Sequence, residues 1–381
     1  MDSSNGPGAA IVPMLLVFAP IPVVIATRPP TVVRLLLLGA QLQLAYTAVT
    51  RNPFLLGDPY HGYVAADTIG IFSSPRYTGE ARPPQELPLL RRVWWATLLV
   101  GAVRGAGWNN TVANIPKVPK HETRRSFVMK RLADAVVFVF VMDIAGIYLT
   151  HNPITSTRAA EHIAPSSQGP VFRILSSFLY MGNFWADSQL QYCILSALVV
   201  GCGADEPQSW PPLWGTFWDA FTVRRLWGRT WHLCMRRFIS SISKTTARLL
   251  GARPGTFASS YIQLYAGFFV SVLVHAFGDL NINNRFGTSF VFFMGQAVII
   301  TVEDFVIALA RKAGVRASAA TRTLGRLYVL AWLCVSLPVL TDPILSSGRP
   351  LVASLPFSVV EALWRAAGME GKWALSFPEP V

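Results

Sequence analysis

A run of residues without any charge is the feature that most constrains how this chain can fold. Residues 254–278 contain no Asp, Glu, Lys or Arg, and roughly 20 such residues suffice for a helix to cross the hydrocarbon core of a bilayer. Only 14% of all residues are charged and the mean hydropathy is +0.40, whereas a soluble domain has about 25% charged residues. The sequence therefore predicts an integral membrane protein and excludes a disordered chain, a coiled coil and a disulfide scaffold.

Apolar runs recur along the chain. The strongest cover residues 11–27, 31–50, 132–150, 188–204, 255–278, 286–310 and 326–341, and weaker ones cover 93–103, 171–186 and 351–366. We predict an all-α, polytopic helical bundle of about 7–10 membrane segments with an internal tunnel, folded as a single integral membrane domain over residues 1–381.

The net charge of +13 lies mainly in the connections between the apolar runs. Three basic connections, residues 117–131, 224–253 and 311–326, are expected to face the cytoplasm by the positive-inside rule. The first two share a side only if residues 171–186 do not cross the membrane on their own. In so apolar a chain, anionic lipid or a phosphorylated substrate is a better match for the positive charge than nucleic acid, which we do not expect as a partner.

One titratable side chain, His275, lies inside the uncharged run. An imidazole is costly to bury in a membrane span and is by default a functional hypothesis. Asp279 follows at i+4 on the same helical face, where its carboxylate can fix the tautomer of His275 and raise its basicity. The alternative is a structural histidine that donates to a backbone carbonyl, with Asp279 merely ending the helix.

A second candidate site is the basic and aromatic run RRLWGRTWHLCMRR at residues 224–237. Arginine, tryptophan and histidine side chains are interleaved in it. This mixture suits a ligand with phosphates and a stackable base, and it suits an anchor at the membrane interface equally well.

Three acids inside apolar runs leave several roles open. Asp143, Glu303 and Asp304 can relay protons in a transporter, act as active-site carboxylates, or pair with histidine or arginine on neighbouring helices. The four cysteines show no metal-ligand spacing, so we expect no metal site.

Three motifs, in order along the chain, resemble a known family. Residues 211–237 resemble the central motif of the wax synthase-like branch of the membrane-bound O-acyltransferases, an FWGRxWH-type run that reads LWGRTWH here, with Leu226 at the usual aromatic position. Upstream, residues 104–116 (RGAGWNNTVANIP) are similar to the RGxGWN run of fungal members. Downstream, residues 270–279 (VSVLVHAFGD) are similar to the helix that carries the catalytic histidine of the family. The resemblance covers residues 104–305, which we predict to be the catalytic core.

The resemblance implies transfer of an acyl group from acyl-coenzyme A (acyl-CoA) to an alcohol inside a membrane tunnel, with no bound cofactor. It makes His275 the catalytic base and places His232 at the second motif position, while Asp279 is predicted from its i+4 spacing to orient His275. An imidazole, with an unperturbed pKa of about 6.5, can accept the proton that an alcohol loses as it attacks a thioester. The residues expected to bind the coenzyme are Arg225, Arg229, Trp227 and Trp231.

Fungal members of this branch commonly acetylate terpenoid or meroterpenoid natural products. The resemblance therefore predicts an acetyl-CoA-dependent O-acetyltransferase for a hydrophobic alcohol, in the membrane of the endoplasmic reticulum. Plant members esterify long-chain alcohols, which makes a long-chain-alcohol O-fatty-acyltransferase the alternative. A proton-coupled transporter and a non-enzymatic membrane scaffold are alternatives from other classes.

The predicted depth of His275 raises a geometric difficulty. If residues 255–278 begin at the cytoplasmic surface, His275 lies about 30 Å below it at 1.5 Å per residue. The histidine is then distant from the LWGRTWH run, unless its helix tilts or breaks, the tunnel reaches across the bilayer, or the segment around Trp227 dips into the membrane.

Overall fold

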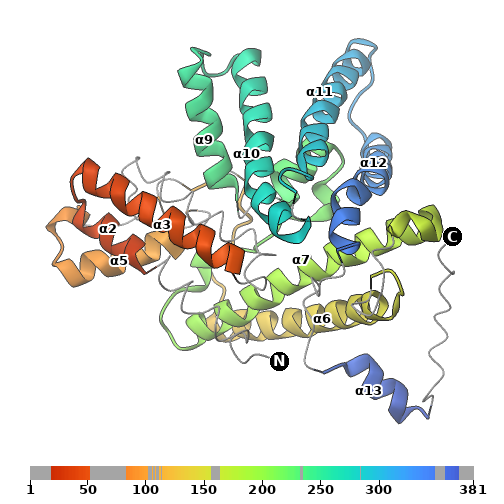
Figure 1. The fold of residues 1–381 in the computed structure, drawn as a ribbon, viewed down its shortest axis with the longest axis horizontal. Helices are drawn as coiled ribbons and strands as arrows, with labels where there is room; N and C mark the ends of the chain where they lie inside the picture. Colours follow the sequence, from red (N-terminus) through yellow and green to blue (C-terminus); the bar gives the residue numbers. More distant parts are fainter. Residues whose placement is uncertain are drawn as a thin grey trace. The chain divides into compact units, whose positions relative to one another are not determined.

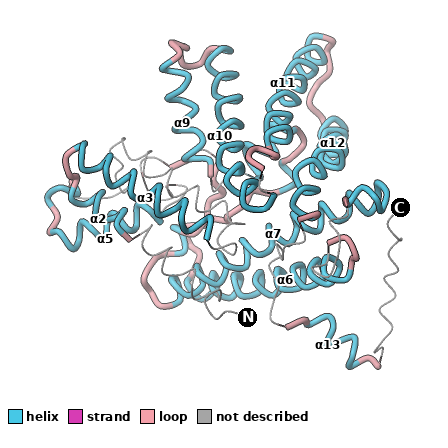
Figure 2. Tube along the Cα trace, viewed as in Figure 1, coloured by secondary structure: helices cyan, strands magenta, loops and turns pink. Residues whose placement is uncertain are grey.

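The structure is a computed structural model that describes residues 19–51, 83–101, 105, 108, 111–112, 114–155, 164–231, 235–283, 285–347 and 357–368. Within these residues every regular element is a helix (Figures 1 and 2). Four of the described helices are long and apolar enough to cross a membrane. The prediction of an all-α, polytopic membrane protein is therefore confirmed, whereas the internal tunnel, the single domain and the catalytic core 104–305 stay predictions.

The chain divides into two compact units, residues 1–115 with 214–318 and residues 116–213 with 319–381. The main elements of the first unit are α2 (Pro20–Thr27), α3 (Thr31–Arg51), α5 (Leu89–Gly101), α8 (Val223–Arg225), α9 (Arg236–Leu249), α10 (Phe257–Asn283) and α11 (Phe290–Lys312). It also contains the 3-10 helices η3 (Pro84–Glu86) and η6 (Phe217–Asp219) and a π-helix, η7 (Leu226–Trp231).

Helices α9, α10 and α11 follow one another as an antiparallel series (Figure 1). A close approach of α9 to α10 occurs at Gly267, where any Cβ would lie 3.1 Å from Ile239 Cγ2 and 3.2 Å from Ser243 Oγ. The turn between these helices has positive φ at Gly251 and Gly255, a conformation that glycine adopts at little cost. Helix α9 therefore packs on the first half of α10, and α10 packs on α11.

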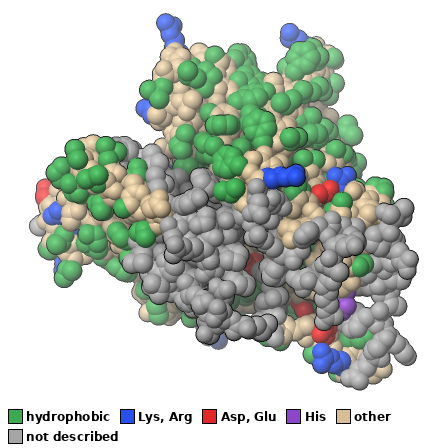
Figure 3. All heavy atoms as spheres, viewed as in Figure 1, with side chains coloured by type: hydrophobic (Ala, Val, Ile, Leu, Met, Phe, Trp, Pro, Cys, Tyr) green, Lys and Arg blue, Asp and Glu red, His purple; other side chains and the backbone are tan. Residues whose placement is uncertain are grey.

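The outer surface of α9, α10 and α11 is largely apolar, and Lys and Arg side chains mark the free ends of these helices (Figure 3). Phe305 on α11, for example, is 64% exposed. In a soluble protein such a surface would be unfavourable, whereas against lipid it is expected. The basic ends agree with a cytoplasmic position of the α9–α10 and α11–α12 connections.

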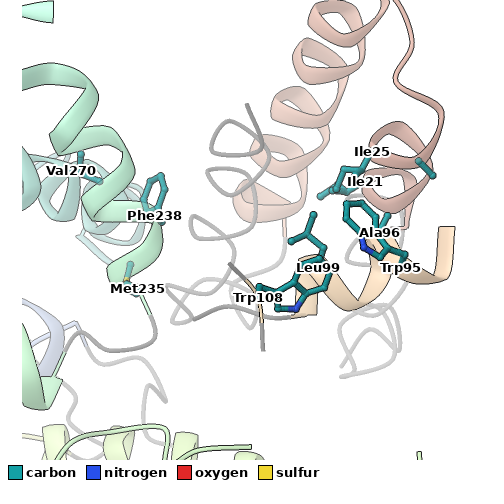
Figure 4. Close-up of a cluster of buried hydrophobic side chains, with 10 residues drawn as sticks. Ile21, Ile25, Trp95, Ala96, Leu99, Trp108, Met235, Phe238 and Val270 are labelled. Carbon is teal, nitrogen blue, oxygen red and sulfur yellow. The ribbon is translucent and has the colours of Figure 1, made fainter. Parts of the chain in front are cut away.

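A cluster of buried apolar side chains in the first unit draws on α2, α5, α9 and α10 (Figure 4). Trp95 on α5 contacts Trp108 edge to face, with ring centroids 5.4 Å apart. Helix α2 is also tied to α5 by a hydrogen bond of 3.3 Å from Arg92 Nη1 to the carbonyl of Ala26. These contacts bury the N-terminal helices of the unit without any charge in the cluster.

The second unit consists of α6 (Arg124–His151), α7 (Gly169–Gly201), α12 (Ala319–Leu345), α13 (Val359–Ala366) and the 3-10 helices η4 (Pro165–Gln168) and η5 (Pro207–Ser209). Helices α6 and α7 pack along their length around Phe138 and Trp185, whose rings meet edge to face at 5.1 Å. Helix α12 is held on α7 by polar groups: Arg173 Nε donates to Asp342 Oδ2 at 2.7 Å, and Thr341 Oγ1 donates to Ser177 Oγ at 2.7 Å.

Asp143 lies in the middle of α6 and is almost fully buried. Its Oδ2 accepts a hydrogen bond of 2.8 Å from the backbone N–H of Val360, in the first turn of α13. The first N–H groups of a helix have no partner within the helix and favour an anion. Asp143 therefore docks α13 onto α6, a role that was not among those considered from the sequence.

Most predicted spans correspond to helices. Residues 31–50, 132–150, 255–278, 286–310 and 326–341 lie within or close to α3, α6, α10, α11 and α12. Residues 171–186 and 188–204, which the sequence separated, belong mainly to the single helix α7. The weak segment is thus not a crossing of its own, and α7 is not among the four described helices that are long and apolar enough to cross a membrane. That the first two basic connections face the same side of the membrane stays a prediction.

Candidate active site

His275 lies near the end of α10 and is half-buried. Its Nδ1 is 2.8 Å from the carbonyl oxygen of Ser271, one turn earlier. Because a carbonyl can only accept, Nδ1 carries the proton and Nε2 keeps its lone pair. The imidazole also contacts the ring of Phe293 on α11, with centroids 4.3 Å apart. In the neutral imidazole this contact selects the tautomer whose Nε2 can take a proton.

Asp279 is buried one turn beyond His275. Its Oδ2 accepts hydrogen bonds of 2.8 Å from both the backbone N–H and the Oγ of Ser289, the residue that caps the N-terminus of α11. Asp279 thus closes the turn between the two spans. The hydrogen bond that orients His275 in the structure comes from Ser271, and a role for Asp279 in tuning the imidazole stays a prediction.

The LWGRTWH run adopts an unusual local conformation, because residues 226–231 form a π-helix. Single π turns are rare and occur frequently at functional sites. The segment 214–216 braces this turn: Gly215 N donates to the Thr230 carbonyl at 3.1 Å, and Thr230 Oγ1 donates to the Thr216 carbonyl at 3.0 Å. Gly215 is required here, since any Cβ would lie 1.9 Å from the carbonyl oxygen of Arg229.

Helix α11 anchors the beginning of this segment with two adjacent acids. Glu303 is buried, and its two carboxylate oxygens accept from the backbone N–H of Val223 at 2.6 Å and of Arg224 at 3.2 Å. Asp304 takes the guanidinium of Arg224 in a two-point ion pair and accepts from the Tyr261 hydroxyl at 3.1 Å. Glu303 therefore fixes the N-terminus of α8 to α11, and Asp304 fixes Arg224, the first arginine of α8.

Trp227 connects the π-helix to the region around His275. Its Nε1 donates to Gln296 Oε1 on α11 at 3.1 Å. Its ring meets Phe268 of α10 at 5.7 Å and Phe293 at 6.4 Å, and Phe293 in turn contacts His275. Since Phe268 lies eleven residues into α10, about 17 Å from its start, the segment around Trp227 lies at membrane depth. This arrangement agrees with the alternative in which the segment around Trp227 dips into the membrane.

The remaining predicted coenzyme ligands differ in their surroundings. Arg225 is engaged within the unit: its Nε donates to the Asp219 carbonyl at 2.8 Å, its Nη2 lies 3.1 Å from the Asp219 carboxylate, and its guanidinium stacks on Phe221 at 4.1 Å. Trp231 packs on Trp214, with centroids 4.7 Å apart. By contrast Arg229 is exposed.

His232, the second predicted catalytic residue, lies outside the described residues. Two residues that the sequence did not single out belong to the same neighbourhood. Gln296 is fully buried against Trp227, and Arg236 Nη1 donates to the carbonyl of Gly228. In the sequence, Gln296 could have been singled out as an amide inside an otherwise apolar run. Arg236 was one of several arginines, and nothing in the sequence distinguished it from the others.

A comparison with known protein families finds a match in the same region of the chain. Residues 210–295 match the model of the membrane bound O-acyl transferase family. Acetyltransferase ple2 of Rhodocybe pseudopiperita is 34% identical over 298 residues, which cover 76% of this chain and 75% of ple2. The chain belongs to the membrane-bound O-acyltransferase family.

Two further relatives of this chain are also named as transferases. Acetyltransferase eriL of Hericium erinaceus is 27% identical and covers 79% of the chain and 78% of its own length. O-Mevalon transferase yanI of Aspergillus niger is 28% identical, with 65% of the chain and 61% of yanI covered. No solved structure matches the chain. The protein is thus an acyltransferase embedded in the membrane, with an acyl donor and an alcohol acceptor as its general substrates.

Proposed function

We propose that this acyltransferase moves an acetyl group from acetyl-CoA to a hydroxyl of a hydrophobic terpenoid or meroterpenoid alcohol, at the endoplasmic reticulum membrane. The names of the relatives ple2 and eriL support the acetyl group. The observation that carries the mechanism is the contact of His275 Nδ1 with the Ser271 carbonyl, which supports a neutral imidazole with Nε2 as the base, and Phe293 links this imidazole to Trp227 of the π-helix.

In the proposed reaction, Nε2 of His275 accepts the alcohol proton as the alcohol oxygen forms its bond to the thioester carbonyl carbon. The C–S bond then breaks, and the imidazolium returns the proton to the departing thiolate. The Ser271 carbonyl stabilises the imidazolium through Nδ1–H. General-base help of this kind accelerates a reaction about 10²- to 10⁴-fold, which corresponds to roughly 3–5 kcal/mol of barrier. His232 is the proposed partner for the developing oxyanion.

The experiment compares membranes that carry the wild-type chain or His275→Ala, supplied with acetyl-CoA or palmitoyl-CoA and a panel of terpenoid and long-chain alcohols. We expect acetyl transfer to a terpenoid alcohol, and a loss of about 10²- to 10⁴-fold in His275→Ala with normal membrane insertion. His151→Ala is the matched control, because His151 Nδ1 makes the same bond of 2.8 Å to a carbonyl one turn earlier, at the exposed end of α6.

Two results would contradict the proposal. Retained turnover in His275→Ala removes the histidine from the mechanism. A preference for palmitoyl-CoA and long-chain alcohols instead identifies the protein as a long-chain-alcohol O-fatty-acyltransferase.

A further inference from the structure

The basic part of the first unit has more positive charge than its own acids can balance. Residues 220–278 contain eight Lys and Arg residues and neither Asp nor Glu. Two of the arginines find acids outside this stretch, Arg224 with Asp304 and Arg225 with Asp219. Arg229 and Arg236 are among the basic residues of this stretch that remain.

Arg229 and Arg236 form a pair of neighbouring cations. Arg236 Nη1 donates to the carbonyl of Gly228, the residue next to Arg229, and the two guanidinium charges repel each other. Among the residues that the structure describes, neither has a carboxylate within ion-pair distance. Arg229 is exposed and Arg236 half-buried. Two like charges held together in this way favour the binding of an anion.

This pair lies at the depth of the membrane span. Met235 and Phe238, at the beginning of α9, belong to the same buried cluster as Val270 of α10, beside which Figure 4 shows them. Val270 is thirteen residues from the first residue of α10, so about 20 Å from the basic turn between the two helices. Uncompensated cations at such a depth are expensive and typically mark a ligand or ion pathway.

We propose that Arg229 and Arg236 together bind the phosphate groups of the acyl donor, a step that rests on the proposed function. Guanidinium groups match phosphate oxygens with two parallel hydrogen bonds and stay charged when partly buried. A nucleotide-bearing thioester supplies the anion that the pair lacks. Its thioester end then extends from the π-helix toward His275, while Arg225 remains with Asp219 as a structural residue.

Helix α9 offers such a donor a route from the cytoplasmic end. Lys244 and Arg248 follow Arg236 at intervals of eight and four residues, so the three cations recur on one side of the helix. Lys244 and Arg248 are both exposed. A row of like charges raises the local concentration of an anionic substrate and guides it inward.

The test measures binding by isothermal titration calorimetry on the full chain in phosphatidylcholine nanodiscs. The probes are CoA, dephospho-CoA and pantetheine, and the variants are Arg229→Gln, Arg236→Gln and Arg236→Lys. Arg316→Gln is the control, an exposed arginine after α11. We expect each glutamine variant to weaken CoA binding about 10- to 100-fold, the worth of a lost charge-assisted hydrogen bond. Arg236→Lys should fall in between, and the control should match the wild type.

Pantetheine has no phosphate, so its binding should be unchanged in all variants, which also shows that they are folded. Equal losses for pantetheine and CoA, or unchanged CoA binding, would overturn the proposal. Repeating the titrations with phosphatidylserine added to the nanodiscs tests a lipid headgroup as occupant: if the variants change only the response to this lipid, the donor assignment is wrong.

Acetyl transfer measured on the same samples separates the two proposals. Arginine-dependent CoA binding without transfer would leave the phosphate site standing and refute the proposed function. Transfer by both glutamine variants with wild-type CoA affinity would refute the phosphate site alone.

Discussion

Replacing Glu303 by glutamine should loosen the motif-bearing segment from α11. The carboxylate accepts two backbone N–H groups, from Val223 at 2.6 Å and from Arg224 at 3.2 Å, and it is 6% exposed. Glutamine keeps one acceptor oxygen and turns the other position into an NH₂ donor that faces an N–H group. One hydrogen bond is then lost, and the acceptor of the other is no longer charged.

The cost follows from these two changes. A buried N–H left without a partner costs about 1–3 kcal/mol, and weakening the second bond from charged to neutral costs about 1 kcal/mol more. The total of roughly 2–4 kcal/mol corresponds to a factor of about 30 to 800 in the equilibrium between anchored and released segment. If the anchored form is the one that binds the donor, activity falls by at most this factor.

Hydrogen exchange read by mass spectrometry is the assay, because it reports the anchor itself. Peptides that cover residues 223–231 should lose protection in Glu303→Gln, whereas peptides from the distal end of α10 should not. Glu361→Gln is the matched control, since Glu361 makes only an exposed i,i+4 ion pair of 3.2 Å with Arg365. Wild-type exchange over residues 223–231 together with full acetyl transfer would show that Glu303 does not anchor the segment.

Two further substitutions test contacts away from the histidine. Asp143→Ala removes the acceptor of the Val360 N–H, so α13 should detach at a cost of about 1–3 kcal/mol, detected as faster proteolysis of the C-terminal region; unchanged proteolysis would contradict the docking role. Arg225→Lys loses the forked contact with Asp219 and the stacking on Phe221. This variant should therefore have a lower melting temperature and unchanged CoA binding. A large loss of CoA affinity would instead show that Arg225 belongs to the coenzyme site.

The helices of this protein were predictable from sequence because the hydrocarbon core demands a minimum apolar length. Their ends were not, since the apolar criterion marks the part of a helix in lipid and not the whole helix. Helix α12 begins at Ala319, several residues before the predicted span at 326, because its first turns carry the polar and basic residues that face water. Helix α7 was divided for the same reason, as its middle contains Asn183 and Asp187.

The contacts of the membrane acids could not be predicted, because each partner is a backbone N–H that the sequence does not mark. Asp143, Asp279 and Glu303 accept from residues 217, 10 and 80 positions away. All three acceptors serve the first turn or cap of another helix. Only the pairing of Asp304 with an arginine was among the predicted alternatives. Asp143 and Glu303 therefore act as structural acceptors and Asp304 as an ion-pair partner, which weakens the case for a proton relay through these three acids.

Gly215 shows how a residue outside the LWGRTWH run can limit the same site. In Gly215→Ala the new Cβ would lie 1.9 Å from the oxygen and 2.9 Å from the carbon of the Arg229 carbonyl. This is backbone against backbone, so no rotamer change relieves it, and the Gly215 N–H bond to Thr230 must lengthen. Overpacking costs about 1–3 kcal/mol or more, and we expect a lower melting temperature and a loss of acetyl transfer. Gly146→Ala on α6 is the control, because its Cβ meets nothing within 4 Å and alanine favours a helix by up to about 1 kcal/mol. A Gly215→Ala protein as stable and active as Gly146→Ala would mean that the brace from residues 214–216 does not shape the π-helix.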